Sequence, residues 1–356
     1  MQHAIPLGTT GLLTSRVGIG GHYRAIEEGC FEERTAWLES EISLRCRITE
    51  QAVACGIRYF DTTWRNESEL LGRALALTGL RDRVTVNGMV LGCFTGPAHF
   101  GLSPEAYLQK WLDERLRHMP DHHFDTFMLN AIEEGFDEAV LERLIPVLER
   151  HRDAGDFSAI GFSTHRPSLA RQVLDRYPVF RTAMIPYNYH NRAMEEAFDG
   201  YCGDAALIAM KPLVWAEYGV PFCALNNDPQ FRERFGFDPD PDIAIDAFRF
   251  ILSHPCITGL VCAVNSEMEV RQLAVAREGV LLPERMAALE RYRVLQEQDG
   301  GVPLFRSALR MDNLRANYFG AAHLARILGR SMPDVRVNAP GARERILAFA
   351  EGLMET

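Results

Sequence analysis

The chain has 356 residues, of which 47% are hydrophobic, so it is long enough and apolar enough to bury a large core. The formal net charge is −10 and no basic run occurs, which argues against nucleic acid as a partner. The N-terminal segment lacks the pattern of a signal peptide, and no apolar stretch reaches the roughly 20 residues of a membrane-spanning helix. We therefore expect a cytoplasmic protein without a membrane partner.

The eight cysteines are scattered along the chain, and no two stand in C-x-x-C spacing. A zinc knuckle, an iron–sulfur cluster or a disulfide framework is therefore not supported, and we expect reduced, mostly buried thiols. Lysine occurs only at Lys110 and Lys211. A mechanism that requires a lysine has these two candidates.

Short apolar segments alternate with amphipathic helical patterns, which is typical of βαβ units and a parallel sheet. Residues 4–15 predict a small hairpin, and residues 16–22 predict the first barrel strand. The further strands are expected at residues 57–63, 83–90, 124–130, 157–164, 181–188, 206–214 and 257–264. The helices are expected at residues 48–56, 67–77, 103–119, 137–155, 167–177, 193–202, 242–254 and 267–276.

Eight strand–helix units are enough to close a barrel. The predicted fold is therefore an α/β protein, a (β/α)8 TIM barrel with an N-terminal hairpin, over residues 1–280. Residues 281–356 carry further helical patterns, such as 283–298 and 341–354. We expect them to form a C-terminal helical extension packed on the barrel.

The active site of such a barrel lies at the carboxyl ends of the strands. This rule selects polar side chains at or just after the strand ends, namely His22, Asp61, Asn87, Asn130, Ser163, Thr164, His165, Asn188, His190, Lys211 and Asn265. Glu133 and Glu134 follow in the loop after the fourth strand. A general acid or base is expected among these residues.

Asp61 is the strongest of these candidates. Residues 57, 59 and 61 alternate onto one face of the strand, which places Asp61 in the barrel mouth. A partly desolvated carboxylate there must find a cation or a donor, or its pKa rises. The alternative is a structural aspartate that caps the next loop.

Several segments resemble the aldo-keto reductase family, in the family's own order. They are GIRYFDTTWRNESELLGRAL (56–75), SAIGFSTH (158–165), PYNYHNR (186–192), MKPLVWAEYG (210–219) and the closing cofactor-binding unit ILSHPCITGLVCAVNSEMEVRQL (251–273). The resemblance covers Ile5 to Ala276 and implies the barrel fold, a small carbonyl or hydroxyl metabolite as substrate and NADPH as cofactor. The C-terminal iron–sulfur motif of one branch of the family is absent from the sequence.

The family's active site is a tetrad of Asp, Tyr, Lys and His. Tyr protonates the carbonyl, Lys lowers the pKa of Tyr, and His orients the substrate. Asp61 matches the aspartate, but Trp64 and Arg65 stand near the position of the tyrosine. Met89 stands in place of the lysine and Asn130 in place of the histidine. The resemblance thus implies a degenerate tetrad.

The resemblance also points to cofactor-binding positions. Ser163 matches the serine that binds the nicotinamide carboxamide, whereas Thr164 and Met184 stand where Asn and Gln are usual. In the turn before Asn265, Ala263 crowds the approach of a phosphate to the backbone. Arg271 is the candidate partner of a 2′-phosphate.

Three functions remain open from the sequence. The first is a reductase with rearranged parts, in which Lys211 pairs with Asp61 and Tyr187 or Tyr189 acts as the acid. The second is a non-redox enzyme (a lyase, isomerase, dehydratase or cyclase) that uses Asp61, deprived of its usual cation, as a base beside His22, His165 and His190. The third is a binding protein that has lost catalysis but keeps a nucleotide pocket.

A metal-dependent version of the second function would use His22, Asp61 and His165, but their spacing gives it no support, so no metal is predicted. The expected substrate pocket is lined by Trp64, Arg65, Asn188, His190 and Trp215. The sequence indicates neither the substrate nor the oligomeric state.

Overall fold

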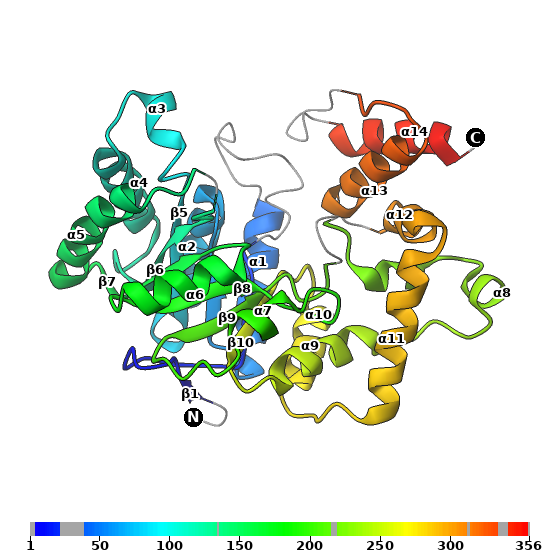
Figure 1. The fold of residues 1–356 in the computed structure, drawn as a ribbon, viewed down its shortest axis with the longest axis horizontal. Coiled ribbons are helices and arrows are strands. Elements are labelled where there is room, and N and C mark those ends of the chain that lie inside the picture. Colours follow the sequence, from blue (N-terminus) through cyan, green and yellow to red (C-terminus); the bar gives the residue numbers. More distant parts are fainter. Residues whose placement is uncertain are drawn as a thin grey trace.

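The computed structural model of this chain describes residues 4–21, 39–133, 135–214, 219–311, 314–333 and 341–354. Eight parallel strands close into a barrel, in the order β10-β3-β4-β5-β6-β7-β8-β9 (Figure 1). The strands are β3 (Val17–Ile19), β4 (Tyr59–Asp61), β5 (Thr85–Leu91), β6 (Phe124–Asn130), β7 (Phe157–Ser163), β8 (Phe180–Pro186), β9 (Ala206–Met210) and β10 (Ile257–Cys262). The predicted (β/α)8 barrel is confirmed.

The N-terminal hairpin is also confirmed. Strands β1 (Ile5–Pro6) and β2 (Leu13–Thr14) pair antiparallel, with Ile5 opposite Thr14. Leu7, in the turn between them, is 1% exposed and packs with side chains of the barrel interior such as Met128. The hairpin therefore covers the amino-terminal end of the barrel and leaves the carboxyl end for chemistry.

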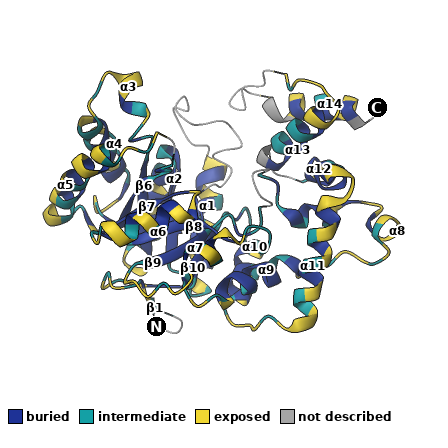
Figure 2. Ribbon diagram, in the orientation of Figure 1, coloured by how far each residue is buried: buried dark blue, intermediate teal, exposed yellow. Residues whose placement is uncertain are grey.

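Helices alternate with the strands around the barrel, and Figure 2 shows their buried faces turned toward it. They are α1 (Glu39–Ala54), α2 (Arg65–Thr78), α3 (Gly96–Phe100), α4 (Pro104–His118), α5 (Glu138–Ala154), α6 (Pro167–Arg176), α7 (Ala193–Ala197), α8 (Phe231–Phe235), α9 (Ile243–Ser253) and α10 (Glu267–Ala276). Ser103 caps α4 by accepting a hydrogen bond from the Ala106 amide, and Gly155 ends α5 with a φ of 86°, both as the sequence predicts.

Two helices depart from the predicted bounds. Helix α1 begins at Glu39 instead of residue 48, because the charged segment before residue 48 still places Ile42 and Arg45 on a buried face. Helix α7 ends at Ala197 instead of residue 202, and Gly200 follows with a φ of 63°, a conformation in which a helix cannot continue.

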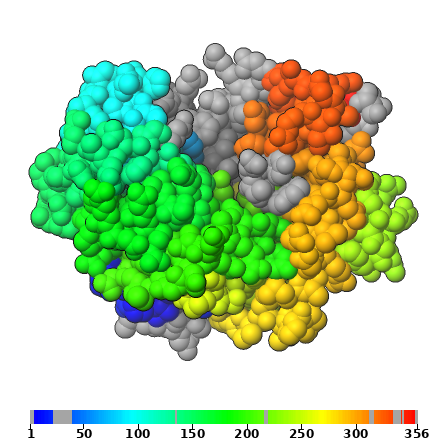
Figure 3. Space-filling view, in the orientation of Figure 1, coloured from blue at the N-terminus to red at the C-terminus, as the bar shows by residue number. Residues whose placement is uncertain are grey.

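Helices α11 (Pro283–Glu297), α12 (Val302–Ala308), α13 (Leu314–Ile327) and α14 (Ala342–Met354) follow the last barrel unit. They lie to the right of the barrel in Figure 1 and form the orange to red surface in Figure 3. Buried side chains of these helices, such as Leu289 and Phe305, belong to the same apolar cluster as those between the barrel strands and helices. Among the described residues, no helix has the length and apolar character that crossing a membrane requires.

The strand register sets which side chains share a level inside the barrel. Asp61 pairs with Asn87 across β4 and β5, and Asn87 pairs with Thr126 across β5 and β6. Because paired residues of parallel strands face the same side, these polar groups form one lateral row. Apolar side chains surround the row inside the barrel: Tyr59, Met89, Met128, Met184, Ile208 and Val261.

Candidate active site

Asp61 lies at the carboxyl end of β4 with 4% of its surface exposed. Its Oδ1 accepts a hydrogen bond of 2.7 Å from the Asn87 side-chain amide, and its Oδ2 accepts one of 3.3 Å from the Thr63 hydroxyl. Thr126 in turn donates to Asn87 Oδ1 over 2.6 Å, which fixes the orientation of the amide. These donors satisfy the ionised form of a carboxylate that is shielded from solvent.

A buried arginine from α4 supplies positive charge near Asp61. Arg115 is 4% exposed and donates to the Thr63 carbonyl and the Ser68 hydroxyl over 2.7 and 3.0 Å. Burial lowers the pKa of its guanidinium to about 10, while the charges of Glu67 and, more weakly, Asp61 oppose the shift. The expectation that Asp61 lacks a nearby cation is therefore corrected.

Arg115 was missed because sequence reasoning treated residues 103–119 as an outer helix. A signal was available, because Arg115 shares the buried face of α4 with Leu108 and Leu112. An arginine on an apolar helical face requires a buried partner. Glu67 provides one within α2, and its carboxylate also accepts the backbone N–H groups of Thr63 and Trp64 over 2.8 Å each.

The two positions where the family carries lysine and histidine are in contact. Met89 is 1% exposed, and the Asn130 side-chain amide lies 3.1 Å from its Sδ. Neither side chain titrates near neutrality, so this part of the mouth offers an amide and a thioether instead of an ammonium and an imidazole. Asn130 remains a polar group that a substrate can contact.

The hydroxyl groups of Tyr187 and Tyr189, the predicted acids, are hydrogen-bonded to carboxylates. The Tyr187 hydroxyl donates to Glu195 of α7 over 2.8 Å, and the Tyr189 hydroxyl donates to Glu290 of α11 over 3.0 Å. Burial and the neighbouring carboxylate raise the pKa of each phenol. Both phenol protons are donated to carboxylates of the surrounding helices, which disfavours either tyrosine as the acid, and the predicted role stays a prediction.

Ser163 ends β7 at the same edge, with 3% of its surface exposed. Its hydroxyl accepts a hydrogen bond of 3.1 Å from the backbone amide of Ala131, whose φ is 51°. A positive φ is costly for alanine, so the loop after β6 is strained in order to point this amide at Ser163. No described residue accepts the hydroxyl proton of Ser163, which leaves a buried donor at the site.

Thr164 is fully buried, and its hydrogen bonds are made to backbone groups. Its amide donates to the Met184 carbonyl, and its hydroxyl accepts from the Arg166 amide, each over 3.1 Å. It therefore orders the start of α6.

His165, in the loop after β7, pairs with Glu133, in the loop after β6. The His165 Nδ1 contacts Glu133 Oε1, and the His165 backbone amide donates to Oε2 over 3.1 Å. Burial alone would raise the pKa of Glu133, but the hydrogen bonds from His165 dominate and lower it to about 2. The side chain of Glu133 is 17% exposed and that of His165 is 45% exposed. An ionised carboxylate thus orients a solvent-accessible imidazole.

The side chain of Asn188 is hydrogen-bonded to backbone groups of the loops around it. Its side-chain amide donates to the carbonyls of Lys211 and Val214, and its Oδ1 accepts from the amides of His190 and Asn191. These four bonds use both donors and both lone pairs of the side chain, so Asn188 has no capacity left for a substrate. Lys211 follows β9, is partly buried and has a φ of 56°, a second strained position at this edge of the barrel.

His190 lies against the C-terminal helices. Its Nε2 is 3.2 Å from the Gln296 amide of α11, and its ring packs on Phe222 with centroids 5.2 Å apart. Burial, followed by the charge of Arg293, lowers the pKa of His190 to about 4. The ring is therefore neutral near pH 7 and joins the barrel to the extension.

Trp64 and Arg65 start helix α2. Trp64 is the N-cap residue, and its amide is held by Glu67. The Arg65 guanidinium forms an ion pair of 2.8 Å with Glu114 of α4. The described contacts of Arg65 thus fasten α2 to α4. His22, Glu134 and Trp215 lie outside the described residues, so their predicted roles stay predictions.

The N-terminus of α10 is closed by its own side chains. The Glu269 carboxylate accepts a hydrogen bond from the backbone amide of Asn265 over 2.6 Å, and the Ser266 hydroxyl accepts one from the backbone amide of Glu269 over 3.2 Å. Arg271 is exposed and contacts Gln51 over 3.4 Å. In this arrangement the first turn carries negative charge where a phosphate would require donors. The described residues therefore suit the nicotinamide end of a dinucleotide, through Ser163, better than a phosphate at α10.

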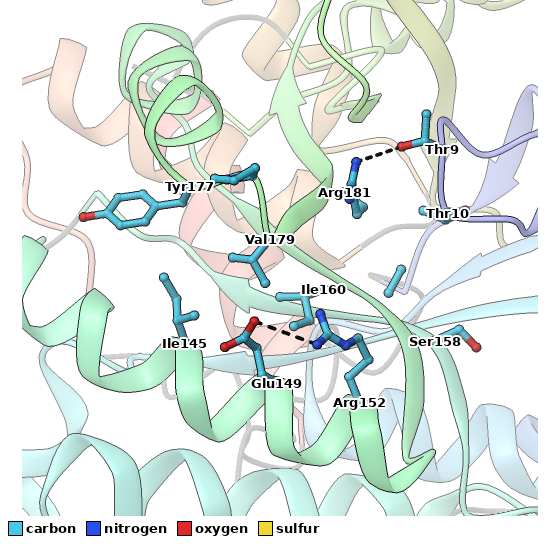
Figure 4. A pocket seen from close by; sticks show the side chains of 12 residues that line it. Thr9, Thr10, Ile145, Glu149, Arg152, Ser158, Ile160, Tyr177, Val179 and Arg181 are labelled. Atoms are coloured by element: carbon cyan, nitrogen blue, oxygen red, sulfur yellow. Dashed lines mark hydrogen bonds and ion pairs between the residues drawn. The ribbon is translucent and has the colours of Figure 1, made fainter.

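A separate pocket of about 570 Å³ lies at the opposite edge of the barrel (Figure 4). Its walls come from the hairpin, from α5 and from the first residues of β7 and β8, such as Ser158 and Arg181. Arg152 pairs with Glu149 and Asp153, and Arg181 contacts Thr9 and Asp204, so both cations have partners. Within the described residues, no group of three or more His, Cys, Asp or Glu side chains could hold a metal ion.

The aldo/keto reductase family model matches residues 33–214. An aldo/keto reductase of Klebsiella pneumoniae, solved with NADP and acetate, has 20% identity and a TM-score of 0.60, covering 82% of this chain and 95% of that one. The holo form of aldo-keto reductase AKR11C1 of Bacillus halodurans has 19% identity and a TM-score of 0.60, covering 83% and 96%. A Klebsiella pneumoniae aldo-keto reductase solved with NADPH has 18% identity and a TM-score of 0.60, covering 85% and 99%. No curated protein sequence matches significantly.

Proposed function

Since this chain belongs to the aldo/keto reductase family, we propose that it is an NAD(P)H-dependent oxidoreductase that acts on a small carbonyl or hydroxyl compound. The observation that carries the proposal is the state of Asp61. It occupies the family's aspartate position at the carboxyl end of β4, buried, hydrogen-bonded by Asn87 and Thr63 and within the field of Arg115. A buried carboxylate is costly unless it is hydrogen-bonded or paired, and polar groups at the carboxyl edge of a TIM barrel are the usual source of its active site.

The cofactor would be held at its nicotinamide end by Ser163. The buried hydroxyl can donate to the carboxamide oxygen while it accepts from the Ala131 amide. When bound, NAD(P)H supplies the hydride. The solved relatives with NADP and NADPH support this choice of cofactor, since they share the barrel over most of their length.

The chain's own residues would bind the carbonyl compound. Asn130, which lies beside Met89 at the end of β6, offers an amide that can donate to the carbonyl oxygen. Asp61 and Arg115 fix the backbone of the neighbouring β4–α2 loop through Thr63. Rigid placement of such groups reduces the entropy that substrate binding and reaction would otherwise cost.

The test is titration with NADPH and with NADH, followed by cofactor fluorescence and by turnover of glyoxal, 4-nitrobenzaldehyde and phenanthrenequinone. We expect micromolar binding, slow turnover, and at least tenfold weaker binding in Ser163→Ala. Ser158→Ala is the matched control, because Ser158 is an exposed serine near the other end of β7. Absence of binding by both cofactors would rule the proposal out.

The Glu133–His165 pair favours a second candidate, a non-redox enzyme, because acid–base chemistry at the rim requires no hydride. A lyase, isomerase, dehydratase or cyclase would use the same barrel mouth. This candidate gains support if neither dinucleotide binds. It loses support if NAD(P)H binds and is oxidised by a carbonyl compound.

A further inference from the structure

Reduction of a carbonyl requires a proton for the oxygen as well as a hydride for the carbon. The positions of the family's tyrosine, lysine and histidine hold Trp64 or Arg65, Met89 and Asn130. Tyr187 and Tyr189, which follow β8, donate to Glu195 and Glu290, and burial raises the pKa of the Tyr59 phenol on β4 well above its ordinary value. These phenols are therefore poor acids, which favours another group at the carboxyl edge as the proton source.

We propose that His165 is the general acid and base of this site, and that Glu133 is its positioning residue. This assignment rests on the proposed oxidoreductase function. Glu133 follows β6 and His165 follows β7, so the pair joins two neighbouring loops directly beyond Asn130 and Ser163. The pair is tied to the site through Ala131, whose amide donates to the Ser163 hydroxyl.

The geometry fixes the tautomer of the imidazole. Glu133 contacts Nδ1 through one carboxylate oxygen and the His165 backbone amide through the other, so the ring cannot rotate without breaking the pair. Nδ1 therefore carries a proton, and Nε2 is the nitrogen that exchanges protons. Within the described residues Nε2 makes no hydrogen bond, and the side chain is 45% exposed. A proton can thus reach Nε2 from solvent.

The reaction step balances as follows. His165 in its protonated form gives the Nε2 proton to the carbonyl oxygen as the carbonyl carbon accepts the hydride, which bound NAD(P)H would supply on its oxidation to NAD(P)+, and the alcohol is formed. The Nε2–H bond breaks, an O–H bond forms, and the ring becomes neutral while Nδ1 stays bonded to Glu133. Water returns a proton to Nε2. In the reverse direction Nε2 takes the hydroxyl proton of the alcohol. Glu133 stabilises the ring while it is protonated and keeps Nδ1 hydrogen-bonded when the ring is neutral.

The charged groups around the ring are consistent with this role. Glu133 is the charged residue in contact with His165, and it stays ionised because hydrogen bonds from His165 outweigh its burial and lower its pKa to about 2. Arg166 is the next residue in the chain, exposed at the start of α6. The imidazole therefore lies between a fixed negative charge and solvent.

The experiment compares His165→Gln, Glu133→Gln and the control His123→Gln, a partly exposed histidine at the opposite edge that contacts the Gly155 carbonyl. NADPH binding and carbonyl turnover are measured with the three carbonyls named above. We expect His165→Gln to lower kcat at least 100-fold with NADPH affinity unchanged, Glu133→Gln to lower it about 10-fold, and the control to match wild type. Nitrogen-15 NMR should show the proton of His165 on Nδ1 in wild type and a mixture of tautomers in Glu133→Gln.

Each other result overturns the assignment. Unchanged kcat in His165→Gln removes His165 as the acid, and loss of kcat in Lys211→Met alone transfers the role to Lys211. An identical tautomer in wild type and Glu133→Gln removes the positioning role of Glu133. A wild-type protein that binds NADPH but reduces none of the carbonyls overturns the proposed function together with this role, whereas absence of cofactor binding contradicts the proposed function first.

Discussion

The side-chain amide of Asn130 lies 3.1 Å from the sulfur of Met89, at the carboxyl edge of the barrel. The strand register explains this contact, because Met89 pairs with Met128 and Leu91 pairs with Asn130 across β5 and β6. Asn130 therefore lies two residues beyond the partner of Met89, on the same side of the sheet. The contact joins the positions at which the family carries its catalytic histidine and lysine. At these two positions this chain therefore holds an uncharged amide–thioether pair.

The Asn130–Met89 contact predicts how far a lysine at position 89 would destabilise the fold. Met89→Lys should destabilise the fold less than Met128→Lys, by about 2 kcal/mol or more. Met89 has the polar neighbour Asn130 and lies near the mouth, whereas Met128 is fully buried among apolar side chains. Urea unfolding of both variants measures the difference. Equal losses of stability would show that the mouth is as apolar as the barrel interior.

Arg115 is expected to stabilise the fold strongly. Arg115→Met should cost about 3–5 kcal/mol, because it leaves Glu67 buried without its cation and removes the bonds to Thr63 and Ser68. Arg117→Met on the exposed face of the same helix is the matched control and should change little.

The double variant Arg115→Met with Glu67→Gln tests the cause. If the buried charge of Glu67 produces the loss, the double variant should recover part of the stability of Arg115→Met. Denaturant unfolding of the four proteins completes the cycle. Additive losses would mean that Arg115 acts through packing alone.

Two partly buried histidines predict a loss of stability in mild acid. Burial, reinforced by nearby arginines, lowers the pKa of both His118 and His190 to about 4. The unfolded chain binds protons at these rings below pH 6.5, but the folded chain does not until about pH 4. Stability is therefore highest above pH 6.5 and falls as the pH drops toward 4, by about 1.4 kcal/mol per pH unit for each ring.

The measurement is the melting temperature between pH 7.5 and 4.5. His118→Gln and His190→Gln should each flatten the dependence, since they remove one titrating group. His99→Gln, at an exposed position on α3, should leave the slope unchanged. A wild-type melting temperature that stays constant over this range would contradict the prediction.

The first turn of α10 predicts the cofactor preference. Glu269→Gln should strengthen binding of NADPH about 2- to 5-fold more than binding of NADH, because it removes a negative charge where Glu269 holds the Asn265 amide. Glu278→Gln, beyond the other end of the helix, should have no such effect. Fluorescence titration with both dinucleotides gives the ratio. Equal effects on both would show that the extra phosphate binds elsewhere.

The barrel could be predicted from the order of residues alone. Alternation of apolar strands and amphipathic helices is a local signal, and it located all eight barrel strands, with segment 124–130 coinciding with β6. It also placed Asp61 at a strand end and in the barrel mouth, because every second residue of a strand faces the same side. The short helix α7 and the early start of α1 were predicted less well, since Gly200 and the charged turn before residue 48 gave no periodic signal.

The contacts of each polar side chain, in contrast, became apparent only in the folded chain. Arg115 reaches the site from a helix 54 residues after Asp61 in the chain, and Glu133 meets His165 across two loops. Likewise, the side-chain amide of Asn188 donates to two backbone carbonyls that lie more than 20 residues further along. Such contacts depend on how the strands close into a barrel, and side-chain hydrogen bonds between distant segments leave no pattern in the local order of residues.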